Sequence, residues 1–250
     1  MHKKSKSVIL TITSKGKFER MCIDVANMSS SVGIGIQDFL ELRENHNFYI
    51  DKTSFIKEWW ESNDSVTLIT RPRRFGKTLN ISMVEEFFSV NYAGRGDLFE
   101  GLSIWEEEKY QKLQGTYPVI SLSFARIKET NYQMTRKKIC QHLTELYAKN
   151  SFLLDGNLLY ETEREYFKSV NVDMDDADAT IALNRLSDYL SRYYGKKVII
   201  LLDEYDTPMQ EAYVNGFWDE MVAFTRSLFK SEKTDSFETL VIPVIIPRPR

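Results

Sequence analysis

Hydrophobic residues recur along this chain with two different periods. Short β-branched or largely apolar runs, which predict strands, lie at 66–70, 117–124 and 198–202. Apolar residues spaced three or four positions apart, which predict helices, lie over 79–88, 132–147 and 179–194. Because strands and helices alternate, we expect an α/β fold with a mostly parallel sheet sandwiched by helices.

The burial of two strands and the ends of one helix can be predicted more closely. The run at 198–202 has no polar interruption and the run at 66–70 is β-branched, so both are expected to be buried strands. Asp178 is expected to cap the helix at 179–194, and Gly195 stands where a glycine often ends a helix.

The chain has 250 residues, a length that suits one large domain or two small ones. Its composition and hydrophobic periodicity divide it into three parts. Residues 1–32 are rich in Lys and Ser and only weakly periodic, so we expect a peripheral leader. Residues 33–232 form the expected folded domain. Residues 233–250 are expected to be an irregular tail, because the last eight hold three of the six prolines. Truncation or a frameshifted, non-native end would explain such a tail.

Composition argues against several classes of protein. Lys and Arg number 33 and Asp and Glu 36, and the resulting net charge of -3 argues against a surface that binds nucleic acid throughout. A local basic patch stays compatible with this balance. The 2 cysteines and 3 histidines do not have the spacing of a zinc site. No apolar run approaches the roughly 18 residues of a membrane span, so the cytoplasm is the expected compartment.

The segment between the strand expected at 66–70 and the following helix has the residue types that bind phosphate. A phosphate site at a helix N-terminus uses backbone N–H groups, a glycine, a lysine for the phosphate oxygens and a hydroxyl for Mg²⁺. Gly76, Lys77 and Thr78 supply the last three, although Arg71 stands where the full P-loop pattern has a glycine. The nucleotide-binding residues expected in this Walker A segment are Arg73, Arg74, Phe75, Gly76, Lys77, Thr78 and Leu79.

A second chemical signal follows the apolar run at 198–202. Asp203 and Glu204 place two carboxylates at the end of a strand, where ligands bind in open α/β sheets. In the Walker B role, Asp203 would hold Mg²⁺, and Glu204 would orient and deprotonate an attacking water. The alternative is a solvated strand end that caps the next helix. For Asp206, a helix cap is at least as well supported as a catalytic role.

Four separated segments of the chain resemble, in the same order, one family of proteins. Their sequences are GIQDFLELRENHNFYIDKTSFIKEW, LITRPRRFGKTLNISM, YPVISLSF and VIILLDEYDTP. They resemble the bacterial AAA-ATPase-like family of P-loop proteins, whose members are often joined to a nuclease-like C-terminal domain of the PD-(D/E)XK type. The resemblance extends over about residues 33–230, and the arginine at position 71 is similar to the family's own form of the loop.

The resemblance implies a P-loop NTPase core of the additional-strand type. In such a core Lys77 and Thr78 would contact the phosphates and Mg²⁺, Asp203 would hold Mg²⁺, and Glu204 would be the catalytic base. Family members continue into a strand that carries a polar sensor residue for the terminal phosphate, a pattern that residues 237–250 do not match.

The segment at 49–53 allows two interpretations. The family's Tyr-x-Asp-Lys-Thr block is similar to the residues Tyr49, Asp51, Lys52 and Thr53. By analogy with related P-loop proteins, a segment just before the first strand can line the adenine site. The sequence alone favours Asp51 or Thr53 as a cap for a helix that includes 55–60.

Together these patterns predict an ATP-binding protein that acts as an Mg²⁺-dependent ATPase, with ATP and Mg²⁺ as its cofactors and Lys77 and Glu204 as catalytic residues. The alternative is a nucleotide-dependent binding or switch module that hydrolyses little ATP and docks protein or DNA. A P-loop kinase is less favoured, because a glutamate directly follows Asp203. The ATPase prediction requires the turn ahead of 79–88 and the acidic strand end at Asp203 to lie side by side on neighbouring strands.

Overall fold

The computed structural model describes residues 8–12, 18–22, 32–62, 66–68, 75–229 and 237–241. Its strands are β1 (Val8–Ile12), β2 (Phe18–Cys22), β3 (Val66–Leu68), β4 (Val119–Ser123), β5 (Val198–Asp203) and β6 (Phe237–Val241). Its α-helices are α1 (Phe39–Glu44), α2 (Ser54–Ser62), α3 (Lys77–Phe88), α4 (Glu108–Gln111), α5 (Tyr132–Lys149), α6 (Glu161–Ser169), α7 (Asp176–Tyr194), α8 (Thr207–Asn215) and α9 (Trp218–Leu228). Short 3₁₀ helices are η2 (Val90–Tyr92), η3 (Gly96–Phe99), η4 (Ser103–Glu106) and η5 (Ser151–Leu154).

A small parallel sheet forms the centre of the fold. Its strand order is β3-β6-β5-β4, and each neighbouring pair is parallel. Strand β6 lies between β3 and β5, so that Thr239 is in register with Val66 on one side and with Ile200 on the other. Strands β1 and β2 pair with each other in a separate antiparallel hairpin. The fold is therefore of the α/β type.

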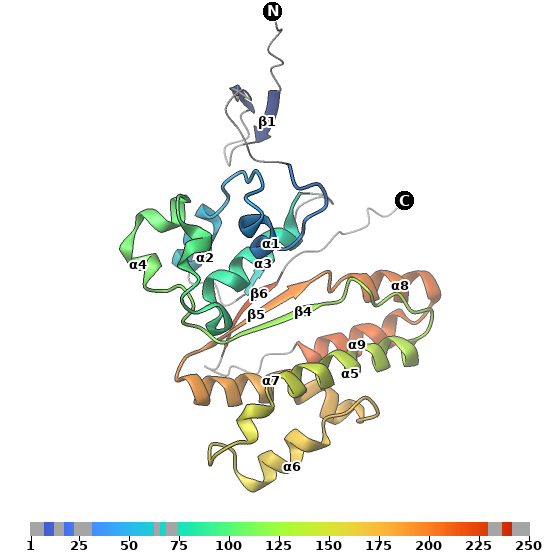
Figure 1. Cartoon of the computed structure of the whole chain (residues 1–250). Coiled ribbons are helices and arrows are strands. Elements are labelled where there is room, and N and C mark those ends of the chain that lie inside the picture. The colour runs from blue at the N-terminus through green and yellow to red at the C-terminus, as the bar shows by residue number, and fades with distance from the viewer. Residues whose placement is uncertain are drawn as a thin grey trace, which may run out of the picture.

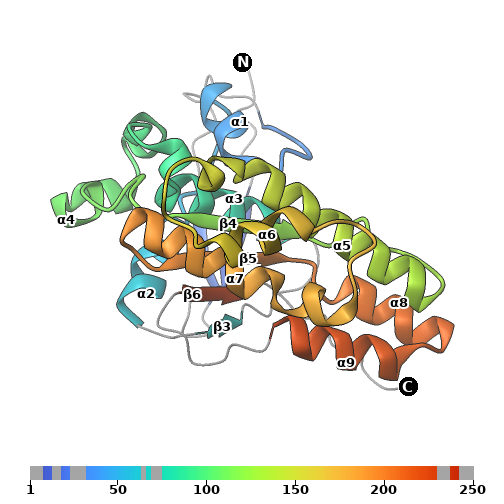
Figure 2. The ribbon, with the colours of Figure 1, turned by 90° about the horizontal axis from the view of Figure 1, so that it is seen from below.

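Helices cover both faces of the sheet (Figure 1). Alternate side chains of β5 point to opposite faces, as the period of a strand requires. Ile199 and Leu201 pack into a buried cluster with residues of α1, α2 and α3, whereas Ile200 and Leu202 pack into a second cluster with residues of α5, α7 and α9. Figure 2 shows α5, α6 and α7 lying across the second of these faces. Since every residue of β5 is buried, the uninterrupted apolar pattern of this strand is explained.

The helices predicted at 79–88, 132–147 and 179–194 are confirmed as α3, α5 and α7. The predicted cap of the last helix is wrong by three positions. Asp175 is the N-cap, and its carboxylate accepts a hydrogen bond from the N–H of Asp178 at 2.8 Å. An aspartate cap bonds the N–H two or three positions ahead of it, so Asp178 provides the donor rather than the cap. Gly195 ends α7 with φ 64°, as expected.

The strand predicted at 66–70 is found as β3, but it is not buried. Val66 and Leu68 are 60% and 49% exposed. In the part of the sheet that the structure describes, β3 is an edge strand that pairs with β6 alone. An edge strand has fewer covering elements than a central one, and the β-branched composition of the segment does not distinguish the two positions.

Irregular structure was expected over 233–250, and at Phe237–Val241 this expectation is wrong. These residues form β6 because their backbone groups complete the ladder between β3 and β5. Residues 233–236 and 242–250 lie outside the described residues. The expected domain boundaries at 32 and 232 stay predictions.

Membrane crossing requires a helix that is both long and apolar. None of the helices in the described ranges meets these two requirements together.

Candidate functional site

Helix α3 begins at the glycine–lysine–threonine sequence. Gly76 precedes the helix with φ 72° and ψ 28°, a left-handed conformation that costs a residue with a Cβ about 1–2 kcal/mol. The N–H of Asn80 donates to the carbonyl of Gly76 at 3.0 Å, so the helix starts directly after the glycine. The first N–H groups of a helix, here including those of Lys77 and Thr78, have no acceptor within it. The start of α3 therefore suits an anion.

Thr78 and Asp203 join the two parts of the site. The hydroxyl of Thr78 donates a hydrogen bond to Oδ2 of Asp203 at 3.1 Å. Thr78 lies in the first turn of α3, and Asp203 is the last residue of β5. The sequence analysis expected neighbouring strands to lead to these two residues, and this expectation is wrong, because β6 lies between β3 and β5. The side chains meet nevertheless at the carboxyl edge of the sheet.

The Asp203 carboxylate is buried, and only one of its two oxygens has a described hydrogen-bond partner. Asp203 is only 5% exposed, and its Oδ1 has no hydrogen-bond partner among the described residues. Burial raises the pKa of Asp203, and the neighbouring Glu204 carboxylate adds to this, while the Thr78 hydroxyl and the charge of Lys77 act against it. A buried carboxylate with an unpartnered oxygen is stabilised by a cation. Asp203 and Thr78 thus fit Mg²⁺, which commonly takes few protein ligands and completes its shell with phosphate oxygens and water.

Glu204 has an unusual backbone conformation. Its φ is 49°, although it is not a glycine. The N–H of Thr207 donates to the carbonyl of Glu204 at 2.9 Å, and the Thr207 hydroxyl donates to Oε2 of Glu204 at 3.3 Å. These bonds hold the turn that follows β5. A non-glycine residue in this region costs of the order of 1 kcal/mol or more, and such costs are concentrated at functional sites.

Asp206 precedes α8 but makes no side-chain capping bond. Its Oδ2 accepts a hydrogen bond from Nε2 of Gln210 at 2.6 Å, one turn into the helix. The expected cap is therefore not formed through the side chain. Pro208 instead lies in the first turn, where its lack of an N–H has no cost.

The structure brings five of the expected site residues together in one region: Gly76, Lys77, Thr78, Asp203 and Glu204. Of the other expected residues, Phe75 is 54% exposed and Leu79 packs against the buried cluster on the α1–α3 face. Arg73 and Arg74 lie outside the described residues, as does Arg71.

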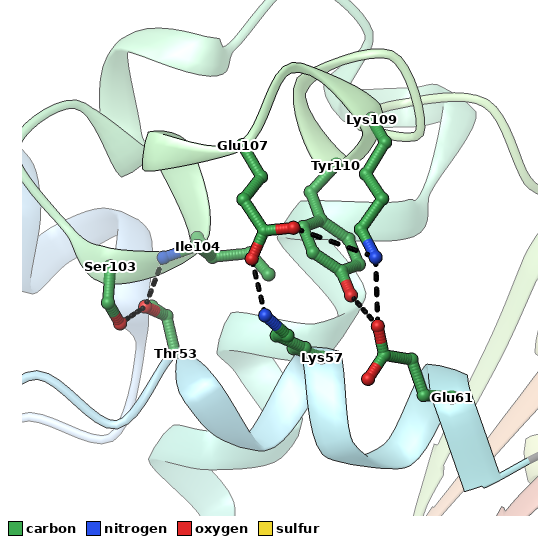
Figure 3. Close-up of polar contacts among 8 residues, drawn as sticks. All are labelled: Thr53, Lys57, Glu61, Ser103, Ile104, Glu107, Lys109 and Tyr110. Carbon is green, nitrogen blue, oxygen red and sulfur yellow. Dashed lines mark hydrogen bonds and ion pairs between the residues drawn. The ribbon is translucent and has the colours of Figure 1, made fainter.

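The segment at 49–53 is fastened to η4 by polar contacts. The Oδ1 of Asp51 accepts hydrogen bonds from the N–H and the hydroxyl of Thr53, at 2.8 and 2.7 Å. The Oδ2 of Asp51 accepts the N–H of Ser103 at 2.8 Å, and the Thr53 oxygen accepts the N–H of Ile104 at 3.1 Å. Figure 3 shows how Thr53, Ser103 and Ile104 meet. Asp51 and Thr53 thus link the start of α2 to η4.

Sequence reasoning named Lys52 only as a member of the segment at 49–53 and gave it no role of its own. In the structure its amine lies beside Gly76. A Cβ at position 76 would lie 3.4 Å from Nζ of Lys52. The Tyr-x-Asp-Lys-Thr pattern at 49–53 marked this segment in the sequence. The pattern does not show where the side chain of Lys52 points, because that depends on the tertiary structure.

Comparison with known proteins places most of the chain in one family. The family described as "Predicted AAA-ATPase" matches residues 33–246. An uncharacterized protein in the vnfD 5′ region of Azotobacter chroococcum mcd 1 is 29% identical over 177 residues, which cover 70% of this chain. The aligned residues span 29% of that protein's length. No solved structure matches this chain significantly.

Proposed function

This chain belongs to the predicted AAA-ATPase family, and on that premise we propose that it binds Mg-ATP between the start of α3 and the end of β5 and hydrolyses it. The observation that carries this proposal is the contact between Thr78 and Asp203 beside the unpartnered Oδ1 of Asp203. A hydroxyl and a carboxylate that meet at a helix N-terminus are the groups that hold a nucleotide-bound Mg²⁺.

The strand order supports a P-loop core of the additional-strand type. Strand β3 leads toward the proposed phosphate loop and β5 ends at Asp203, and β6 is inserted between them. In open parallel sheets ligands bind beyond the carboxyl ends of the strands. Both halves of the proposed site lie at that edge.

Each residue has a role that follows from its position. The backbone at Gly76 and the first turn of α3 would donate N–H bonds to phosphate oxygens, and the amine of Lys77 would neutralise their charge. Thr78 and Asp203 would hold Mg²⁺, which when bound neutralises charge on the phosphates. Glu204 follows directly and would orient a water for attack on the terminal phosphorus.

The proposed chemical step is in-line hydrolysis. The water oxygen bonds to the terminal phosphorus as the bond from that phosphorus to the bridging oxygen breaks, and Glu204 accepts the water's proton. The products are ADP and inorganic phosphate. The step uses no co-reactant other than water.

Phosphate release and nucleotide binding, measured on the same proteins, test this proposal. Lys77→Ala should lose both, because the amine contacts the phosphates in ground and transition states. Glu204→Gln should keep binding and lose release by about a hundredfold or more, since general base catalysis contributes about 10²–10⁴. Lys112→Ala, an exposed lysine paired with Glu108, is the matched control. Equal release from all four proteins would reject the assignment.

The same measurements address the binding or switch module. Thermal stabilisation of the wild-type chain by Mg-ATP, without release of phosphate, would support that alternative and reject hydrolysis.

A further inference from the structure

Lys52 lies over the glycine at which α3 begins. Its Nζ is 3.4 Å from the position that a Cβ of residue 76 would occupy, and apart from residues 75–77 and the adjoining backbone of α3 no other described atom comes within 4 Å of that position. The space above Gly76 is where the backbone donors of α3 begin. The Lys52 amine therefore borders the place at which an anion would meet the helix.

The backbone at Lys52 is held from several sides. Its N–H donates to the hydroxyl of Tyr49 at 3.3 Å, and its carbonyl accepts the N–H of Phe55 at 3.0 Å. The Tyr49 hydroxyl in turn donates to the sulfur of Met83 on α3 at 3.1 Å. The flanking Asp51 and Thr53 are bonded to η4. The backbone of Lys52 is thus held by hydrogen bonds in a segment that contacts α3 through Tyr49.

The hydroxyl of Thr53 makes three of the hydrogen bonds that hold this segment. It donates its one proton to Asp51, so the contact of 3.1 Å with the Ser103 hydroxyl must be donated by Ser103. The Thr53 oxygen also accepts the N–H of Ile104. All of its hydrogen-bonding capacity is used, in a residue that is 0% exposed.

The neighbouring lysines have carboxylate partners, whereas no described carboxylate pairs with Lys52. Lys57 forms an ion pair with Glu107, and Lys109 lies 2.8 Å from Glu61 (Figure 3). Among the ion pairs within the described residues, none includes Lys52, which is exposed. The ammonium group is consequently directed at the start of α3 without an internal counter-ion.

We propose that Nζ of Lys52 binds phosphate oxygens of the nucleotide at the start of α3, as a second cation beside Lys77. This inference rests on the proposed nucleotide site, which is supported by the buried unpartnered oxygen of Asp203, an observation that does not involve Lys52. A nucleoside triphosphate carries more negative charge than one Mg²⁺ and one lysine neutralise, so a further ammonium group there stabilises the complex. The segment at 49–53 then contacts the phosphates and not the base.

Isothermal titration calorimetry with Mg-ATP and with inorganic triphosphate, on the full chain, tests this inference. Lys52→Met keeps the aliphatic stem and removes the charge. It should weaken binding of both probes by about ten- to a hundredfold, the loss expected for one charge-assisted hydrogen bond. Lys52→Arg should recover most of the ATP affinity. Lys112→Met removes the same charge from an exposed lysine and should change affinity by less than about twofold.

Two results would overturn the proposal. In the first, Lys52→Met binds both probes as Lys112→Met does, while Lys77→Met loses them. In the second, Lys52→Met weakens ATP but not inorganic triphosphate, which would place the amine at the base. Melting curves without ligand show whether Lys52→Met folds, and its binding should depend less on salt than that of the wild type. A wild-type chain that binds neither probe would reject the proposed site itself, and this inference with it.

Discussion

The hydroxyl of Thr78 donates a hydrogen bond to the carboxylate of Asp203 at 3.1 Å, across 125 positions of sequence. The contact joins the first turn of α3 to the end of β5. Strand β3, which precedes α3 in the chain, is separated from β5 by β6. The contact leaves Oδ1 of Asp203 buried without a described partner. Within the described parts of the chain, this buried carboxylate therefore has one oxygen without a hydrogen-bond donor.

Asp203→Asn should stabilise the protein without nucleotide and weaken its response to Mg-ATP. Asparagine removes the buried charge, and its carbonyl can still accept the Thr78 hydroxyl. The melting temperature without ligand should rise, since burial raises the pKa of Asp203 and thus disfavours its ionised form. Mg²⁺-dependent ATP affinity should fall by about tenfold or more, because a charged ligand is lost. A variant that melts lower than the wild type and gains as much stability from Mg-ATP would contradict this.

Gly76→Ala should weaken nucleotide binding by more than its cost in stability explains. The left-handed φ of 72° gives alanine a strain of about 1–2 kcal/mol. Its methyl group would also enter the space between the helix start and Nζ of Lys52. Affinity for Mg-ATP should fall about tenfold or more, measured by calorimetry.

Gly156→Ala provides the matched control for that change. Gly156 has φ 84°, and apart from residues 155–157 no described atom lies within 4 Å of an added Cβ. This variant should show similar backbone strain and unchanged ATP affinity. Equal affinities of the two alanine variants would argue against phosphate contact at Gly76.

Glu86 should make the stability of the protein depend on pH. It is 1% exposed, and burial raises its pKa from 4.5 to about 7. Its Oε1 accepts the Ser82 hydroxyl at 2.7 Å, and Ser82 accepts the N–H of Phe39 at 2.8 Å, so the carboxyl is placed at the start of α1. The carboxylates of Asp38 and Glu85 also favour its protonated form.

The sign of this dependence follows from proton binding. Between pH 4.5 and about 7 the folded state holds a proton at Glu86 that the unfolded state has lost, so stability falls as pH rises through this window. Glu86→Gln stays neutral and keeps an acceptor for Ser82. At pH 8 it should be more stable than the wild type by up to about 3 kcal/mol, since one pKa unit corresponds to about 1.4 kcal/mol. Urea denaturation at several pH values measures this. The exposed Glu108→Gln should leave the profile unchanged, and a wild-type profile that rises over the window would refute the prediction.

Thr53→Val should destabilise the link between α2 and η4. Valine has a similar shape but leaves the N–H of Ile104 and the hydroxyl of Ser103 without their acceptor. The free energy of unfolding should fall by about 1–3 kcal/mol, the usual cost of unsatisfied buried groups.

A second threonine provides the comparison for Thr53→Val. The hydroxyl of Thr180 donates only to carbonyls of its own helix, at the surface of α7. Thr180→Val should change the free energy of unfolding by less than about 0.5 kcal/mol. Chemical denaturation of both variants measures the two changes in the free energy of unfolding. Equal losses of stability would show that the Thr53 hydrogen bonds contribute no more than those of a surface threonine.

Elements that depend on local interactions could be predicted from the sequence. The spacing of apolar residues predicted α3, α5 and α7, and Gly195 marked the end of α7 because a left-handed residue there favours glycine. The cap was misplaced by three positions, since several aspartates near the start of α7 all suit the role and only the backbone conformation selects Asp175.

Elements that depend on distant partners could not be predicted in the same way. Strand β6 was missed because the nearby prolines argued against a strand, and its ladder is completed by β3 and β5. The exposure of Val66 was missed because β-branched residues suit edge and central strands alike.

The sequence by itself determined which chemical groups are available, because Gly76, Lys77, Thr78, Asp203 and Glu204 follow local rules for phosphate and carboxylate sites. Only the tertiary structure decided how these groups meet. The register of parallel strands brought Thr78 to Asp203, and contacts between the 49–53 segment and η4 directed Lys52 toward Gly76. Such contacts join residues far apart in the chain, and their geometry is fixed by packing and not by the pattern of neighbouring residues.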